Sequence, residues 1–215
     1  MSSVTFAPAR YLTMPREKII LSDCDGCMVS WNKGFNLFMA ERGMPQLPDT
    51  DHEYSLATRH GITMQKAGGL IREFNEGPWI ADLEPFGDAV EYVQKLADKG
   101  FRFIVVTSIS SAPSAFFHRT TNLTKLFGSV FNEINCIEMG ASKAHILKRW
   151  EDTGYFWIED HMRQAEAGYE AGLKTVLINH PYNSHYITDL FPTVSYTSPW
   201  KEIYNMVCKE YNIDK

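Results

Sequence analysis

The segment from Lys18 to Val29 constrains the fold of this 215-residue chain more than any other. Three aliphatic residues at positions 19–21 run directly into Ser-Asp-Cys-Asp-Gly. A short uninterrupted apolar run is typical of a strand that is covered on both faces of a parallel sheet. Asp23 and Asp25 then fall at the carboxyl end of that strand, where open α/β sheets place their ligands. Two carboxylates followed by Gly26 can hold a hard cation, or they can form an acidic turn that only reverses the chain.

The composition is that of an ordinary globular protein, with 44% hydrophobic and 22% charged residues. A chain of this length forms one domain, or a core with a small insert, and buries a substantial core. The net charge of −5 and the lack of a long basic run disfavour binding to a nucleic-acid polymer. A small anionic substrate stays open, because a local metal ion can override the overall charge.

The N-terminal residues 1–16 have no apolar core of signal-peptide length, and no apolar run in the sequence is long enough to span a membrane. We therefore expect a cytoplasmic protein with no membrane partner and with reduced thiols. Cys24 and Cys27 form a C-x-x-C pair, a spacing found in redox and zinc motifs. Because no second C-x-x-C or H-x-x-H accompanies the pair, we expect neither chemistry from it.

Strand-like and helical segments alternate along most of the chain. We predict an irregular lead-in over 1–16 and a first strand with its turn over 18–27. Further strands are predicted at 101–108, near 131–137, at 154–160 and at 175–179. Helices are predicted after residue 30, over 89–97, 113–127 and 143–152 with Ser142 as N-cap, before Gly172, and over 200–211. This alternation predicts an α/β fold, a Rossmann-like three-layer α/β/α arrangement around a parallel sheet.

The region from about 42 to 82 has a different residue pattern from the rest of the chain. Glycine and proline separate short helical pieces, and no strand-like aliphatic run occurs. We predict a small, mostly helical insert over 33–82, which leaves 1–32 and 83–215 to the core. Its aromatic residues, Tyr54, Phe74 and Trp79, either line a pocket or form the core of the insert itself.

Three predicted strands end in functional side chains, and parallel strands bring these ends to one edge of the sheet. Carboxylates, hydroxyls and an ammonium are the groups that bind a phosphate together with a divalent metal. The residues expected at this edge are Asp23, Asp25, Thr107, Ser108, Lys143, Glu159 and Asp160. Each also has a plain interpretation as a strand end or a solvated turn, and Lys125 and Lys148 compete with Lys143 for the role of the ammonium.

The order Asp-x-Asp-Gly, strand-Thr-Ser, Lys, strand-Glu-Asp resembles the four motifs of the haloacid dehalogenase (HAD) superfamily, chiefly phosphatases and phosphotransferases. The resemblance covers about 18–180 and places the insert where that superfamily has a small cap. Segments 83–89, 106–108 and 179–183 are also similar to the 5'(3')-deoxyribonucleotidases. Those enzymes typically have an aliphatic or Met residue at position 24, Val at 27 and Asp at 159, where this chain has Cys24, Cys27 and Glu159.

The resemblance implies the catalytic and metal-binding roles. Asp23 would be the nucleophile that forms an aspartyl-phosphate, and Asp25 would be the general acid and then the general base. The cofactor would be Mg²⁺, bound by the carboxylates of Asp23 and Asp160 and the main-chain carbonyl of Asp25. Glu159 would either bind the metal directly or orient a metal-bound water from outside the ligand shell, and we favour the second role.

The resemblance also implies how the phosphate is held. Thr107 and Ser108 would donate hydrogen bonds to the phosphoryl oxygens, and Lys143 would neutralise their charge. His118 and Arg119 lie just after the second motif, and they either touch the substrate or belong to a solvated helix face. We expect His161, beside Asp160, to be a neighbour of the site and not a ligand.

These assignments predict a Mg²⁺-dependent phosphomonoester hydrolase, with nucleoside monophosphates as the favoured substrates and 5'(3')-deoxyribonucleotidase as the favoured activity. Two alternatives stay open. A phosphosugar phosphatase or phosphomutase is one, because Glu159-Asp160 followed by a Gln-Ala-containing helix also resembles the β-phosphoglucomutase branch. A HAD-fold binding protein without catalysis is the other. A homodimer is open too, because exposed aromatic residues serve a dimer patch as well as a pocket.

Overall fold

The computed structural model describes residues 17–186 and 188–213, and the lead-in expected over 1–16 lies outside that range. Its centre is a six-stranded parallel sheet in the order β3-β2-β1-β4-β5-β6. The strands are β1 (Ile19–Ser22), β2 (Arg102–Ser108), β3 (Phe131–Ile137), β4 (Phe156–Glu159), β5 (Lys174–Asn179) and β6 (Thr193–Ser195). The predicted α/β class is confirmed. Strand β6 was not predicted, because three residues are too few to show a period.

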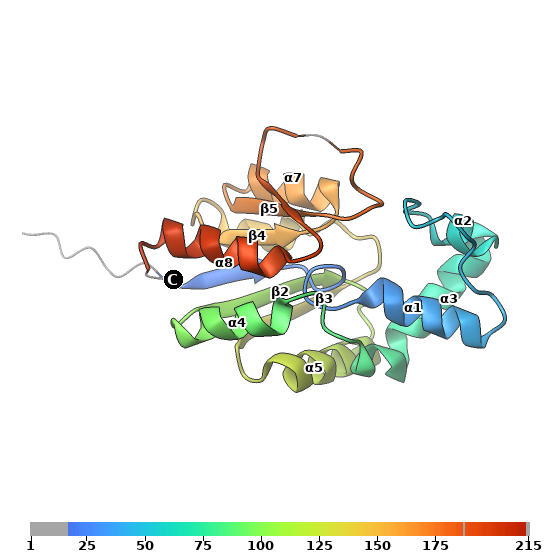
Figure 1. Cartoon of the computed structure of the whole chain (residues 1–215). Coiled ribbons are helices and arrows are strands. Elements are labelled where there is room, and N and C mark those ends of the chain that lie inside the picture. Colours follow the sequence, from blue (N-terminus) through green and yellow to red (C-terminus); the bar gives the residue numbers. More distant parts are fainter. Residues whose placement is uncertain (1–16, 187, 214–215) are drawn as a thin grey trace, which may run out of the picture.

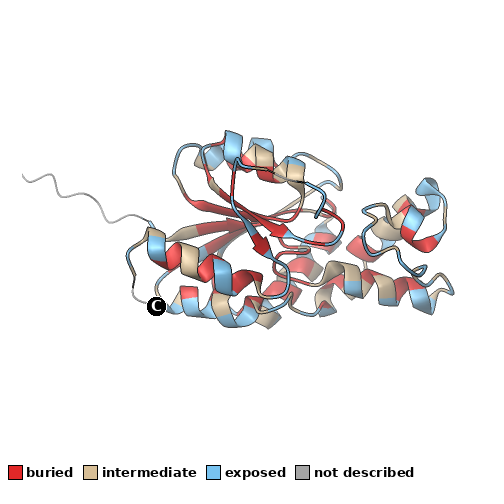
Figure 2. Cartoon of the chain, turned by 45° about the horizontal axis from the view of Figure 1, so that its top comes forward, coloured by how far each residue is buried: buried red, intermediate tan, exposed pale blue. Residues whose placement is uncertain are grey.

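Helices cover both faces of the sheet (Figure 1). On one face lie α4 (Ala89–Asp98), α5 (Pro113–Phe127) and α8 (Pro199–Glu210), and on the other lie the short α6 (Ala144–Leu147) and α7 (Met162–Glu170). Figure 2 shows the buried side of each layer turned towards the strands. Within the described residues, no helix combines the length and the apolarity that a membrane span requires.

The first strand shows why its apolar run is uninterrupted. Ile20 packs into the cluster beneath α4, α5 and α8, whereas Leu21 packs into the cluster on the α6 and α7 side. Both side chains have no exposed surface. Full burial of such a side chain stabilises a protein by roughly 1.5–3 kcal/mol, so the strand is fixed from both faces.

The helical insert contains α1 (Trp31–Glu41), α2 (Leu56–His60), α3 (Met64–Glu76) and the 3-10 helix η1 (Pro78–Asp82), which extend to one side of the sheet (Figure 1). Two of its three noted aromatic residues form an internal core, since Phe74 is fully buried and Trp79 packs edge-on against Phe38. The segments that enter and leave the insert are joined by a hydrogen bond, because Ser30 donates its N–H to the Glu84 carbonyl at 2.9 Å.

The helix predicted over 143–152 is wrong in extent. Only α6 is α-helical, and η2 (Lys148–Trp150) tightens the chain into a 3-10 turn. Ser142 is not its N-cap, because Lys143 occupies that position and the Ser142 hydroxyl accepts the N–H of Ala144 at 3.2 Å. Asp152 has a left-handed backbone (φ 56°), which a right-handed helix excludes.

Two glycine substitutions test the packing with opposite signs. A Cβ on Gly168 of α7 would lie 2.1 Å from Trp157 Cδ1, whereas a Cβ on Gly69 of α3 meets no atom within 4 Å. We expect Gly168→Ala to lower the free energy of unfolding by about 1–3 kcal/mol through overpacking. Gly69→Ala should raise it by about 0.5–1 kcal/mol through the lower chain entropy of alanine. Urea unfolding measures both, and equal effects would contradict the described packing.

Candidate active site

The turn after β1 brings the first motif aspartate to the end of β4. The N–H of Asp23 donates to the Ile158 carbonyl at 2.8 Å, and the Cys24 carbonyl closes the turn by accepting the N–H of Met28 at 2.7 Å. Gly26 has φ 76°, and a Cβ there would lie 2.3 Å from Asp160 Oδ2. Only glycine therefore lets the turn approach Asp160 this closely.

Lys143 supplies the buried ammonium of the site. Its Nζ lies 2.8 Å from Asp23 Oδ1 and 2.7 Å from Glu159 Oε2. Burial works against the charged ammonium, but the two carboxylates outweigh it and hold the pKa of Lys143 above its usual range. The competing residues lie elsewhere, since Lys125 pairs with Asp82 at the surface and Lys148 is exposed on η2.

The second motif aspartate, Asp25, faces two donors. Arg119 Nη2 lies 2.5 Å from its Oδ1, and Thr107 Oγ1 lies 3.5 Å from its Oδ2. Burial raises the pKa of Asp25, and the Arg119 guanidinium opposes that rise. The Arg119 side chain is fully buried, so its interpretation as part of a solvated helix face is wrong. Its neighbour His118 packs against Phe117.

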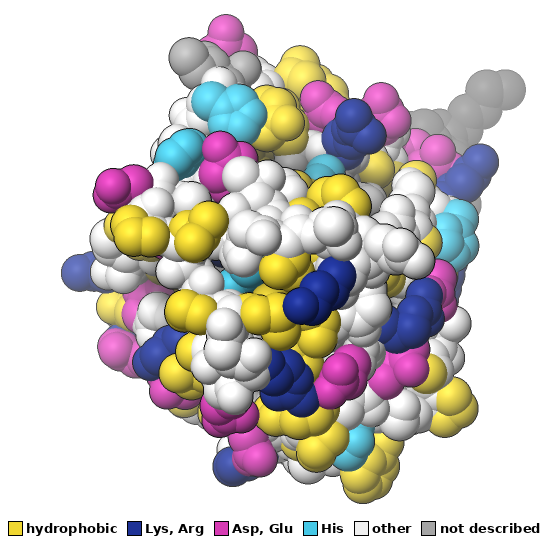
Figure 3. Space-filling model, turned by 90° about the vertical axis from the view of Figure 1, so that its right-hand side faces the viewer, with side chains coloured by type: hydrophobic (Ala, Val, Ile, Leu, Met, Phe, Trp, Pro, Cys, Tyr) yellow, Lys and Arg dark blue, Asp and Glu magenta, His cyan; other side chains and the backbone are white. Residues whose placement is uncertain are grey.

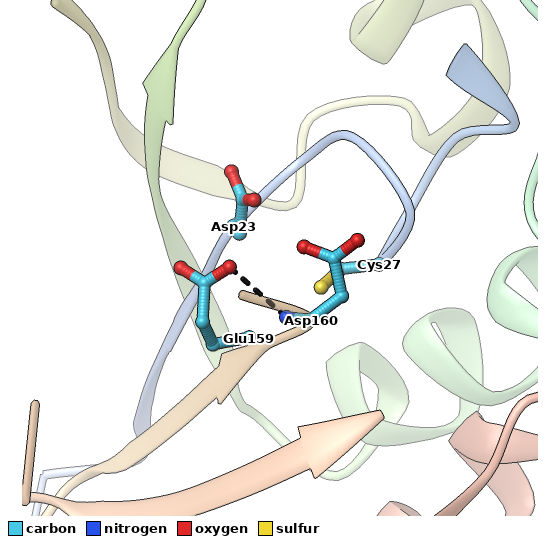
Figure 4. A group of neighbouring side chains, drawn as sticks. All are labelled: Asp23, Cys27, Glu159 and Asp160. Carbon is cyan, nitrogen blue, oxygen red and sulfur yellow. Dashed lines mark hydrogen bonds between the residues drawn. The ribbon is translucent and has the colours of Figure 1, made fainter. Parts of the chain in front are cut away.

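An acidic cluster forms between the first motif and the end of β4 (Figure 4). Carboxylate oxygens of Asp23, Glu159 and Asp160 and the Cys27 sulfur all lie within 4.8 Å of one another. Burial, followed by the charge of Asp23, raises the pKa of Asp160 to about 7. This mutual repulsion and the oxygen-rich donor set suit a hard divalent cation. Burial raises the pKa of the Cys27 thiol, which keeps it neutral.

Glu159 has both carboxylate oxygens occupied by protein donors. Oε2 accepts from Lys143, and Oε1 accepts the N–H groups of Asp160 at 2.9 Å and His161 at 3.0 Å. The side chain is fully buried. Glu159 thus fixes the ammonium and the backbone that carries Asp160. His161 is a neighbour of the cluster, and its ring contacts Tyr54.

The loop after β5 supports Asp160, a role that was not predicted for its residues. The Tyr182 hydroxyl donates to Asp160 Oδ2, and Asn183 Nδ2 donates to the Asp160 carbonyl at 2.6 Å. The Nε2–H of His180 donates to the Gly26 carbonyl at 2.8 Å, which ties this loop to the first turn. The segment 179–183 was noted only for its resemblance, because no periodic pattern reveals such loop-to-loop contacts.

A cavity of about 640 Å³ connects the acidic cluster to the insert. From the strand ends it is lined by Asp23, Asp25, Thr107, Ser108, Lys143, Glu159 and Asp160, and from the insert by Trp31, Tyr54, Leu56, Arg59, Met64 and Ile71, among others. Ser108 is also bound to the protein, since its hydroxyl donates to the Ala141 carbonyl at 3.2 Å. Tyr54 thus lines this cavity, whereas Phe74 and Trp79 do not. On the side of the molecule shown in Figure 3, hydrophobic, basic and acidic side chains are interspersed.

Comparison of sequences finds one distant relative among curated proteins, and no family model matches the chain. The chain is 26% identical over 135 residues to an uncharacterized 32.4 kDa protein from the Gp30-rIII intergenic region of Enterobacteria phage T4. The alignment covers 60% of this chain and 48% of that protein, so this chain spans about half the length of the relative.

Several solved structures are similar to this chain over most of its length. A haloacid dehalogenase-like family hydrolase from Streptococcus pneumoniae matches with a TM-score of 0.61 at 13% identity, covering 90% of this chain and all of that one. A protein described as a predicted phosphoglycolate phosphatase from Haemophilus somnus matches at 0.59 and 16%, covering 90% and 99%. A HAD hydrolase from Bacillus subtilis bound to magnesium matches at 0.56 and 16%, covering 89% and 99%. At these identities the likeness shows the fold, and the chain has the HAD fold.

The buried imidazole of His180 predicts how stability depends on pH. Burial lowers the pKa of His180 from 6.5 to about 4. Below pH 6.5 the imidazole is therefore protonated in the unfolded chain, whereas in the folded chain it stays neutral down to about pH 4. His180 therefore costs stability progressively as the pH falls through this window, by up to about 1.4 kcal/mol per pH unit.

His180→Gln isolates this effect. We expect the variant to be less stable than the wild type at pH 7, and the gap to narrow between pH 6.5 and 4.5. Urea unfolding at several pH values measures the gap, and a gap that stays constant would show that His180 is protonated equally in both states.

Gly26→Ala tests the approach of the first turn to Asp160. The added methyl group would displace the Asp160 carboxylate. We expect the affinity for Mn²⁺, measured by calorimetric titration as a probe of the Mg²⁺ site, to fall about 10- to 100-fold. Gly128→Ala is the matched control, because Gly128 has φ 70° but open space around its Cβ position. An equal loss of affinity in both variants would attribute the effect to backbone strain alone.

Proposed function

We propose that this chain is a Mg²⁺-dependent phosphomonoester hydrolase that acts through an aspartyl-phosphate on Asp23. One observation carries the proposal: three groups with complementary chemistry lie at the same cavity. They are a candidate nucleophile paired with a lysine, a candidate acid-base residue and an acidic cluster. Asp23 is held by Lys143, Asp25 is held by Arg119 and Thr107, and Asp160 completes the cluster. The HAD fold, shared with hydrolases, supports the same chemistry.

In the proposed first step, a carboxylate oxygen of Asp23 attacks the phosphorus. The ester P–O bond breaks, and its electron pair leaves with the ester oxygen, which takes a proton from the Asp25 carboxyl group. In the second step water attacks the phosphorus of the aspartyl-phosphate and gives a proton to the Asp25 carboxylate, while the P–O bond to Asp23 breaks and its electron pair returns to the Asp23 carboxylate. Inorganic phosphate leaves, and Asp23 and Asp25 return to their starting states.

The remaining polar residues hold the phosphoryl group. Thr107 and Ser108, at the end of β2, donate hydrogen bonds to its oxygens, and Lys143 neutralises the charge that develops on them. Lys143 also fixes the rotamer of Asp23, because it bridges Asp23 and the fully buried Glu159. The nucleophile is thereby oriented before the substrate arrives, and no reorganisation is needed during the reaction.

The donor set fits Mg²⁺, since Asp23 and Asp160 lie within 4.8 Å of each other, while Lys143 pairs with Asp23 and Glu159 and leaves Asp160 without an ion pair among the described residues. The carboxylates of Asp23 and Asp160 and the main-chain carbonyl of Asp25 would hold the ion. When bound, it would reduce the repulsion between Asp23 and an anionic substrate. Glu159 would act indirectly, because both of its oxygens already accept protein hydrogen bonds.

For the substrate we propose a nucleoside monophosphate, and for the activity that of a 5'(3')-deoxyribonucleotidase. The cavity of about 640 Å³ falls within the size range of small-molecule sites. Trp31 and Tyr54 reach it from the insert beside Leu56 and Met64, which offers a base both aromatic and apolar surface. Tyr54 is 65% exposed, so its ring can stack on a ligand.

A substrate panel tests this proposal. We expect phosphate release from deoxynucleoside 5'- and 3'-monophosphates to exceed release from sugar phosphates, and EDTA to abolish it. Release from sugar phosphates but not from nucleotides would favour the phosphosugar phosphatase or phosphomutase alternative. No release from any substrate would favour the binding protein without catalysis.

Asp23→Asn tests the nucleophile. We expect turnover to fall by at least about 10³-fold, because an amide oxygen does not replace the nucleophilic carboxylate. Asp82→Asn is the control, since Asp82 is an exposed acid that pairs with Lys125 at the surface. Wild-type turnover in Asp23→Asn would show that the activity comes from a contaminant or from another residue.

A further inference from the structure

Arg119 is a fully buried cation that makes one short polar contact. It projects from α5, and its Nη2 donates to Asp25 Oδ1 at 2.5 Å. Its Nε and Nη1 atoms are buried without a hydrogen-bond partner in the described structure. The other charged or titratable side chains that influence it are the thiols of Cys24 and Cys136. Asp25 is thus the acidic side chain that faces this guanidinium group.

This arrangement is costly as a purely structural device. A buried guanidinium is desolvated, and each unpaired donor adds to the cost. A buried ion pair is often no more stabilising than apolar side chains of similar volume, even when its geometry is good. Here only one nitrogen of the guanidinium makes a hydrogen bond. The pair is therefore expected to stabilise the fold no more than an apolar residue at this position of α5 would. The geometry instead constrains one atom, Asp25 Oδ1.

The helix that carries Arg119 is itself fixed. Asn122, three residues later on α5, donates to the Leu83 carbonyl at 2.8 Å, where the chain returns from the insert. Thr107 approaches the other oxygen of Asp25 at 3.5 Å from the end of β2. Each oxygen of the Asp25 carboxyl group therefore faces a donor from a different element, α5 or β2, and these two donors define the orientation of the group.

We propose that Arg119 is a positioning residue that orients the Asp25 carboxyl group towards the leaving oxygen of the substrate. This inference rests on the proposed function, in which Asp25 gives that oxygen its proton. Arg119 acts through Asp25 and does not touch the substrate. Removal of Arg119 frees the carboxyl group to rotate, and proton transfer then becomes less efficient while Asp23 and Lys143 stay in place.

The dependence of kcat/KM on the leaving group isolates this role. We would measure it for phenyl, 4-nitrophenyl and 2,4-dinitrophenyl phosphate, because kcat/KM covers only the steps up to departure of the leaving group. A dinitrophenolate leaves without a proton, whereas a phenolate needs one. We expect Arg119→Met to lower kcat/KM about 10- to 100-fold for phenyl phosphate and about threefold or less for dinitrophenyl phosphate. A loss of the same size for every substrate would overturn the proposal and leave Arg119 a merely structural residue.

A double-mutant cycle with Asp25→Asn provides the second readout. If Arg119 acts only through Asp25, Arg119→Met should change kcat/KM for phenyl phosphate by less than about twofold in the Asp25→Asn background. A further loss of tenfold or more would show that Arg119 serves another group. If Arg119→Met does not fold, Arg119→Lys takes its place, with an intermediate leaving-group dependence expected and a uniform loss overturning the proposal.

Lys125→Met is the matched control on α5, because Lys125 pairs with Asp82 at the surface. It should leave kcat/KM unchanged for all three substrates. Failure of the two proposals is distinguishable. A wild-type protein that hydrolyses none of the phosphates overturns the proposed function and this inference together. A leaving-group dependence in Asp25→Asn without one in Arg119→Met overturns this inference alone.

Discussion

The bridge made by the Lys143 ammonium between Asp23 and Glu159 is the interaction on which the site depends. Burial and the neighbouring carboxylates raise the pKa of Asp23 above its usual range. The Lys143 ammonium opposes this rise and favours the ionised carboxylate. Lys143 is buried with them, so its charge acts at short range and little screened by solvent. The HAD fold provides the place for this bridge, because three parallel strands end at one edge.

Around that bridge the structure positions each motif aspartate with a different part of the chain. Lys143 and the end of β4 hold Asp23, whereas α5 and the end of β2 hold Asp25. The loop after β5 holds Asp160 through Tyr182 and Asn183. Because each carboxylate has its own support, a substitution in one support is expected to affect one chemical role and leave the others.

The strand-end residues could be predicted from the sequence, and the reason is physical. Parallel strands expose their carboxyl ends at one edge, so Asp23, Thr107 and Glu159 had to lie together once the strands were recognised. Arg119 was not predictable in the same way. A charged residue among polar ones on a helix indicates solvent, and only the tertiary structure shows that Asp25 lies beneath it. The supports from the loop after β5 were missed because irregular backbone carries no period.

Local signals also failed where a tertiary contact overrode them. Ser142 before a polar and apolar run predicts a helix start, yet the chain forms only one α-helical turn there, and Lys143 turns its side chain into the site. The insert, by contrast, was predicted as helical without its contacts. Its aromatic core around Phe74 could not be distinguished in advance from the pocket face that carries Tyr54.

The central claim is that Asp23 accepts the phosphoryl group. We would incubate Asp25→Asn, in which we expect hydrolysis of the intermediate to be slowed, with Mg²⁺ and 2,4-dinitrophenyl phosphate. Acid quenching and peptide mass spectrometry would then locate any phosphoryl group on the protein. The account predicts one phosphoryl group on the peptide that contains Asp23, released by hydroxylamine as an acyl phosphate is, and absent when Asp23 is also replaced by Asn. Release of dinitrophenol without phosphorylation of Asp23, or with phosphorylation of another residue, would contradict it.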